Sequence, residues 1–116
     1  MLMNEIIKLI DARSVCGDVC TLSTDDFEFA FASDLMSDVL RLTYDKTMLI
    51  TGLCNVQTIR TAEMAEINLI IICRGKKCDA QMLSIAKDCD ICLLETDHSV
   101  YRVCGELYSY GIKPLY

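Results

Sequence analysis

Three features are missing from this sequence of 116 residues: a long apolar run, an excess of positive charge and a recognisable catalytic motif. The longest apolar stretch, Ile67 to Cys73, is interrupted by Asn68 and is far shorter than the roughly 20 residues that a membrane-spanning helix needs. The formal net charge is −6, and no basic face interleaved with aromatic residues occurs, so a phosphate backbone would be repelled. We therefore expect neither a membrane protein nor a nucleic-acid-binding protein.

The sequence patterns that position a nucleophile, a zinc ion or a nucleotide phosphate in common enzymes are also missing. No G-x-S-x-G, H-E-x-x-H or G-x-x-x-x-G-K-[ST] pattern occurs. His98 is the only histidine, and without a nucleophile it is more simply an exposed residue in the first turn of a helix. Asp34 and Asp38 lie one helical turn apart and can bind a cation, but acids at a helix start also interact favourably with the helix dipole. The sequence therefore predicts a protein that is not an enzyme.

Cysteine, by contrast, is abundant. The segment Met1 to Glu5 has no basic stretch leading into an apolar run and a cleavage site, so we expect no secretory signal and a cytoplasmic location. Thiols stay reduced in the cytoplasm, which argues against a disulfide framework for the eight cysteines. Four of them can be paired into a set of zinc or iron–sulfur ligands, although their spacing matches no strong template: Cys16, Cys20, Cys89 and Cys92.

The first third of the chain has patterns of both helix and strand. Met3 to Ala12 repeats apolar residues at helical spacing and predicts an amphipathic helix. Val15 to Leu22 indicates a short strand and a turn. The phenylalanines at every second position from Phe27 to Phe31 predict a strand with one buried face. Ser33 is then expected to cap a helix over Asp34 to Leu42.

Three near-continuous apolar runs dominate the rest, and each precedes a helical segment. The runs are Thr47 to Thr51, Leu69 to Cys73 and Ile91 to Glu95, and their starts are 22 residues apart in both cases. Such runs are typical of parallel strands buried on both faces. The sequence predicts a single α/β domain over residues 1–116, layered, with a largely parallel sheet and helices on both faces. The helices are expected at Val56–Glu66, Ala80–Asp88 and His98–Tyr110, capped by Asn55, by Asp79 and by Thr96 or Asp97.

Ligands of open parallel sheets usually bind beyond the carboxyl ends of the strands, where helix N-termini point their amides outward. Glycines in the loops at that edge would let a ligand approach the backbone, hydroxyl and amide groups would bind it, and the basic cluster would hold a phosphate. Ordinary loop chemistry, helix capping and balancing of the chain's own carboxylates are the alternative. The predicted ligand-binding residues are Ser33, Asp34, Thr51, Gly52, Asn55, Arg74, Gly75 and Lys76.

Several of these segments, taken together, resemble DRTGG domains over nearly the whole chain. The resemblance rests on the opening helix and on Ala32–Leu40, Leu49–Asn55, Ile59–Met64 and the Arg74-Gly75 turn. It departs at the motif that names the family: Asp26 stands where the family has its Asp, but Phe27 replaces the Arg and residues 30–32 hold no glycine pair. The resemblance implies an α/β fold like the N-terminal domain of HPr kinase/phosphorylase, and self-association.

The resemblance also implies a role. Related domains lie beside CBS domains in regulated pyrophosphatases and in phosphate acetyltransferases, as sensory or dimerising parts. We therefore expect a non-catalytic regulatory, sensory or dimerisation module, a homodimer, that binds a protein partner or a small anionic or nucleotide-like ligand at the carboxyl edge of its sheet. Stand-alone relatives are also associated with hydrogenases, so the alternative is an iron–sulfur or redox accessory protein of hydrogenase or electron-transfer metabolism.

Overall fold

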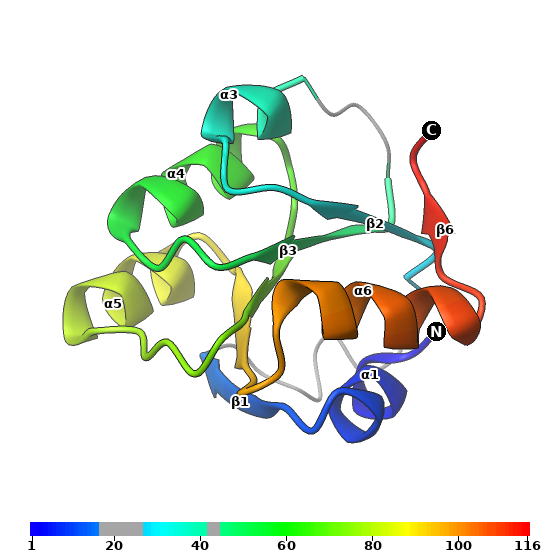
Figure 1. Ribbon diagram of the computed structural model, residues 1–116. Helices are drawn as coiled ribbons and strands as arrows, with labels where there is room; N and C mark the ends of the chain where they lie inside the picture. Colours follow the sequence, from blue (N-terminus) through cyan, green and yellow to red (C-terminus); the bar gives the residue numbers. More distant parts are fainter. Residues whose placement is uncertain (17–26, 42–44) are drawn as a thin grey trace.

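One six-stranded sheet lies between two layers of helices in the computed structural model, which describes residues 1–16, 27–41 and 45–116 (Figure 1). The strand order is β1-β5-β4-β3-β2-β6, and the pairs are parallel except for β1 with β5. The strands are β1 (Arg13–Cys16), β2 (Phe29–Ala32), β3 (Thr47–Thr51), β4 (Leu69–Ile72), β5 (Cys92–Glu95) and β6 (Lys113–Pro114). The helices are α1 (Met3–Leu9), α3 (Met36–Val39), α4 (Val56–Met64), α5 (Ala80–Asp88) and α6 (Val100–Ser109). The predicted α/β class with a largely parallel sheet is confirmed.

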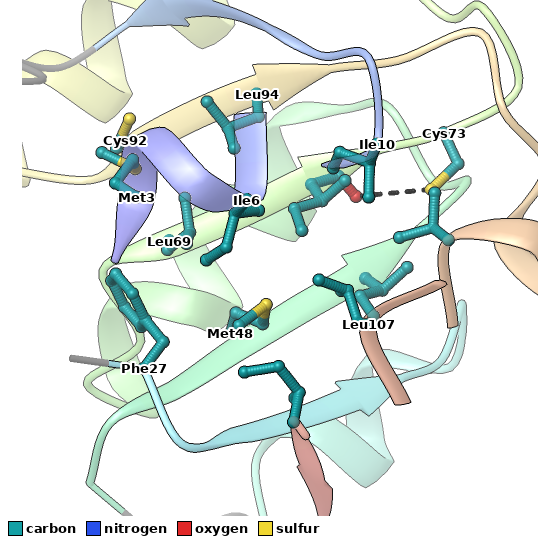
Figure 2. Close-up of a cluster of buried hydrophobic side chains, with 14 residues drawn as sticks. Met3, Ile6, Ile10, Phe27, Met48, Leu69, Cys73, Cys92, Leu94 and Leu107 are labelled. Carbon is teal, nitrogen blue, oxygen red and sulfur yellow. Dashed lines mark hydrogen bonds between the residues drawn. The ribbon is translucent and has the colours of Figure 1, made fainter. Parts of the chain in front are cut away.

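The core consists of two layers, one on each face of the sheet. Helices α1 and α6 pack on one face, and α3, α4 and α5 pack on the other (Figure 1). Strand side chains alternate between the layers, so Met48 and Ile50 face α1 and α6 while Leu49 faces the opposite helices. Figure 2 shows Met3 and Ile6 of α1 in the core layer on the α1 and α6 face. Every residue of β3, β4 and β5 is buried, which explains their near-continuous apolar sequences.

The three predicted strand-helix units are present, with small differences at their ends. Strand β3 and helix α5 have the predicted bounds, while β4 ends one residue earlier and β5 begins one residue later than expected. Asn55 caps α4 by accepting a hydrogen bond from the Thr58 amide at 3.1 Å, and Asp79 caps α5 through the Met82 amide at 2.8 Å. Both caps were predicted, although α4 ends at Met64, two residues early.

Helix α6 begins later than predicted, at Val100, and its cap is Ser99. The Ser99 side chain accepts from the Arg102 amide at 3.1 Å. The predicted cap Thr96 is buried and donates its hydroxyl hydrogen to the Ile10 carbonyl at 2.7 Å, so it is engaged elsewhere. The C-terminal strand β6 was not predicted at all. None of the helices in the described parts of the chain is long and apolar enough to cross a membrane.

The segment around β2 also differs from its prediction. Phe27 is buried against α1 on one face, whereas Phe31 packs toward the opposite layer, so the phenylalanines do not share a face. The amides of Glu28 and Phe29 both donate to the Lys46 carbonyl, at 3.0 and 3.2 Å, and such doubled pairing interrupts the alternation of side chains. Helix α3 has only four residues. Its N-cap is Leu35, and Ser33 caps no helix. Of the predicted segment 15–22, residues 17–22 lie outside the described residues.

Candidate functional site

The carboxyl ends of four neighbouring parallel strands meet at one edge of the sheet. Strands β2, β3, β4 and β5 end there. The predicted site residues lie at the ends of β2, β3 and β4 or in the loops that follow them, and the loop after β5 lies beside the loop after β4. Two backbone hydrogen bonds join the last two loops: the Arg74 amide donates to the His98 carbonyl at 2.9 Å, and the Gly75 amide donates to the Thr96 carbonyl at 3.0 Å. The edge is therefore a connected surface.

Asp34 joins the first two loops of this edge. Its Oδ1 accepts hydrogen bonds from the Thr51 hydroxyl at 2.8 Å and from the Gly52 amide at 2.9 Å. These bonds, that of Gly52 first, lower the pKa of Asp34 below its ordinary value, and the positive charges of Arg74 and Lys76 lower it further. Asp34 is thus an exposed, ionised carboxylate with a fixed orientation.

Arg74 lies directly over Gly52. Its Nη2 donates to the Gly52 carbonyl at 3.3 Å, and a Cβ atom at position 52 would lie only 2.7 Å from the Arg74 Nε. Glycine at position 52 therefore permits the approach of the guanidinium. Arg74 itself has a φ of 66°, in the left-handed region, and Gly75 follows with a φ of 72°. This tight turn presents the exposed side chains of Arg74 and Lys76 at the sheet edge.

The other two predicted ligand residues have local roles. Asn55 is the cap of α4, as described above. The Ser33 amide donates to the Ile50 carbonyl at 3.1 Å, and its hydroxyl oxygen accepts from the Leu35 amide at 2.9 Å. Both side chains thus form local loop or helix-cap hydrogen bonds, as the alternative interpretation expected. Hydrogen bonds connect Asp34, Thr51, Gly52 and Arg74 into one group, as the prediction of a shared edge requires.

Sequence reasoning missed a buried carboxylate at the same edge. Glu95, at the end of β5, is only 4% exposed. Its Oε2 accepts from the Cys78 amide at 2.8 Å, and its Oε1 lies 3.3 Å from Arg13 Nη2 and 3.8 Å from Lys77 Nζ. The sequence signal was a charge at the end of an otherwise apolar run. All three cations of the basic cluster are exposed, but Lys77 lies beside the Glu95 carboxylate of the chain, whereas Arg74 and Lys76 lie on the side of Asp34.

His98 is placed differently from its prediction. It precedes the cap of α6 and its side chain is only 13% exposed, so it is not an exposed first-turn residue. Its Nδ1 lies 2.8 Å from Glu106 Oε1, and the same carboxylate oxygen lies 3.5 Å from Arg102 Nε. This contact ties His98, which lies just before α6, to Glu106 within that helix.

The four cysteines proposed as cluster ligands do not converge where the structure describes them. Cys92 is buried on the α1 and α6 face, whereas Cys16 and Cys89 pack on the opposite face. The Cys16 thiol donates to the Leu83 carbonyl at 3.3 Å, and the Cys89 thiol donates to Glu63 Oε2 at 2.7 Å. Cys20 lies outside the described residues. Within the described ranges no three His, Cys, Asp or Glu side chains gather as a metal site.

Comparison with solved structures shows a similarity of fold. The structure of the CBS and DRTGG domains of the regulatory region of Clostridium perfringens pyrophosphatase, complexed with its activator diadenosine tetraphosphate, matches with a TM-score of 0.69 at 10% identity. The match covers 97% of this chain and 50% of that one, so this chain spans half its length. No family model matches the sequence. No curated protein matches it at a significant level. The similarity shows a fold in common with that regulatory region.

Proposed function

We propose that this protein is a non-catalytic regulatory module that binds a small anionic, nucleotide-like ligand at the carboxyl edge of its sheet. The observation that carries the proposal is the exposed pair Arg74 and Lys76, presented by a left-handed turn beside the Gly52 backbone. A guanidinium in that position matches the geometry of a phosphate. The fold shared with a regulatory region that was solved with a nucleotide activator supports this class of ligand.

The contacts of Arg74 suit exchange for a ligand. Its hydrogen bond to the Gly52 carbonyl is long, at 3.3 Å, and joins the guanidinium to an uncharged acceptor, so a phosphate oxygen is a stronger partner. Asp34 holds the Gly52 amide and keeps its negative charge. A carboxylate there repels phosphate and accepts hydrogen bonds from hydroxyl or amino groups. The edge therefore favours a ligand that carries both kinds of group.

Calorimetric titration with adenosine mono-, di- and triphosphate and with diadenosine tetraphosphate tests this proposal. We expect at least one of these nucleotides to bind, and Arg74→Ala and Lys76→Ala to weaken that binding by about tenfold or more, because a charge-assisted hydrogen bond contributes about 1.5–3 kcal/mol. Lys87→Ala is the matched control, since Lys87 is an exposed cation in the last turn of α5, away from the carboxyl edge. Failure of all four nucleotides to bind, or equal weakening by the control, contradicts the proposal.

We also propose self-association through the surface formed by α6 and β6. Tyr108 and Tyr110 are each 69% exposed, and Tyr108 lines an apolar groove of about 170 Å³ between α6 and the edge of the sheet. Exposed aromatic residues around an apolar groove are typical of protein interfaces.

Sedimentation velocity over a range of protein concentrations tests self-association. A homodimer is expected for the wild type and a monomer for Tyr108→Asp. Met64→Asp, on the opposite layer of helices and 65% exposed, should leave the dimer intact. A wild-type monomer at the highest concentration would exclude this interface.

A further inference from the structure

Three sulfur atoms meet near the carboxyl edge, in a group that the proposed ligand site does not use. Cys54 directly precedes the cap of α4, Cys78 directly precedes the cap of α5, and Met82 lies in the first turn of α5. The Cys54 Sγ lies 3.8 Å from the Met82 Sδ and 3.4 Å from the carbonyl oxygen of Lys77, the residue before Cys78. Besides burial, the nearby Cys54 thiol contributes to the raised pKa of Cys78. The two loops after β3 and β4 thus bring two thiols and a thioether together.

The spacing of these sulfurs fits a single metal ion. Sulfur ligands at about 2.3 Å from a tetrahedral ion lie about 3.8 Å from one another, which is the separation of Cys54 Sγ and Met82 Sδ. Met82 is 1% exposed, and Cys54 and Cys78 are half-buried, so little water competes for the site. Cys54 and Met82 are therefore close enough to share an ion, and Cys78 follows the residue whose carbonyl the Cys54 thiol contacts.

The donor types decide which metal fits. Two thiols and a thioether form a soft set, and such sets select Cu(I), whereas Mg²⁺ and Ca²⁺ require oxygen ligands. Zinc also binds thiolates, but its protein ligands are Cys, His, Asp and Glu, so the thioether of Met82 would contribute nothing to it.

The electrostatic surroundings define how such an ion would bind. Burial raises the pKa of the Cys54 and Cys78 thiols, so both are protonated near neutral pH. Binding of Cu(I) forms two sulfur–metal bonds to thiolates and one to the thioether, and it releases the two thiol protons to solvent without any change of oxidation state. The N-termini of α4 and α5 and the positive charge of Lys76 favour the remaining negative charge, against the nearby Glu95 carboxylate.

We propose that Cys54, Cys78 and Met82 form a binding site for Cu(I). The site uses neither Arg74 nor Asp34, and it uses none of the four cysteines first considered as cluster ligands.

Anaerobic titration of the full chain with Cu(I), in competition with the coloured chelator bathocuproine disulfonate, tests the proposal. We expect the wild type to take up one ion per chain, and Cys54→Ser or Cys78→Ser to abolish uptake. Met82→Leu should weaken it by about tenfold, as expected for the loss of one weak ligand. Cys89→Ser is the control, because Cys89 lies at the far end of α5. Wild-type affinity in both serine variants, or an equal loss in the control, overturns the proposal.

A second measurement uses only the wild-type protein and so does not depend on whether the variants fold. The wild type is alkylated with and without Cu(I), and the modified cysteines are identified by mass spectrometry. Protection of Cys54 and Cys78, with unchanged labelling of Cys16 and Cys89, supports the site. Absence of protection, or protection of other cysteines instead, overturns it.

Discussion

Glu95→Gln should destabilise the protein by about 2 kcal/mol, although the substitution keeps the shape of the side chain. The carboxylate is buried, but both of its cationic partners are partly in solvent: the side chain of Arg13 is 44% exposed and that of Lys77 is 61% exposed. Loss of the negative charge therefore leaves no cation stranded in the core, and the larger penalty of a broken buried pair does not apply.

The magnitude follows from the three contacts of the carboxylate. The bond from the Cys78 amide, at 2.8 Å, loses its charge assistance, which costs about 1 kcal/mol. The half-exposed Arg13 pair contributes up to about 1 kcal/mol, and the longer Lys77 pair about 0.3 kcal/mol. We therefore expect Glu95→Gln to lower the free energy of unfolding most, Arg13→Gln less and Lys77→Gln least. The recovered hydration of the carboxylate keeps the total near 2 kcal/mol rather than higher.

Urea denaturation measures these differences as shifts of the midpoint at constant slope. Glu28→Gln is the control, because Glu28 forms an ion pair with Lys46 at 3.7 Å in which both side chains are exposed. This substitution should change the free energy of unfolding by less than about 0.5 kcal/mol. A Glu95 and Arg13 double variant should be less destabilised than the sum of the single variants. Strict additivity, or a Glu95→Gln effect no larger than that of the control, would refute the reasoning.

Three further predictions concern the same edge and the core. The ionised Asp34 carboxylate should contribute less than about 1 kcal/mol to the free energy of unfolding above pH 4, and this contribution should be lost as the pH falls through its lowered pKa. Asp34→Asn removes the contribution, so the acid unfolding curves of the variant and the wild type should converge at low pH. Gly75→Ala should cost about 1–2 kcal/mol because its φ is 72°, whereas Gly52→Ala only displaces the Arg74 guanidinium and should cost less; thermal unfolding in the reverse order would contradict this. Burial raises the pKa of Cys73 to about 12, so iodoacetamide should modify it far more slowly in the native than in the urea-unfolded protein, and equal rates would exclude that environment.

The parts of the fold that were predictable are those with one strong local signal. Strand β3 has a near-continuous apolar run, and α5 has a single capping candidate, Asp79, so both bounds were correct. The carboxyl edge was predictable because parallel strands place their ends together. For the same reason Asp34 was expected on one surface with Thr51 and Gly52, which follow it by 17 and 18 residues, and it is hydrogen-bonded to both there.

The other features depend on contacts between distant residues. Thr96 and Ser99 are both good caps, and only the hydrogen bond of Thr96 to Ile10 decides between them. Phe27 leaves the expected face because two amides share the Lys46 carbonyl. The partners of Glu95 lie up to 82 residues away, so its burial could not be inferred from its neighbours in sequence.

The sheet order has a consequence for how the chain assembles. The four inner strands pair with their neighbours in chain order, from β2 to β5, so each can join the growing sheet soon after it is synthesised. Both outer strands instead pair across most of the chain: β1 pairs with β5, and β6 pairs with β2. Long-range pairing is slow because a long loop must close first. We expect the inner strands to associate early and the two edges, including the Arg13 and Glu95 pair, to close last.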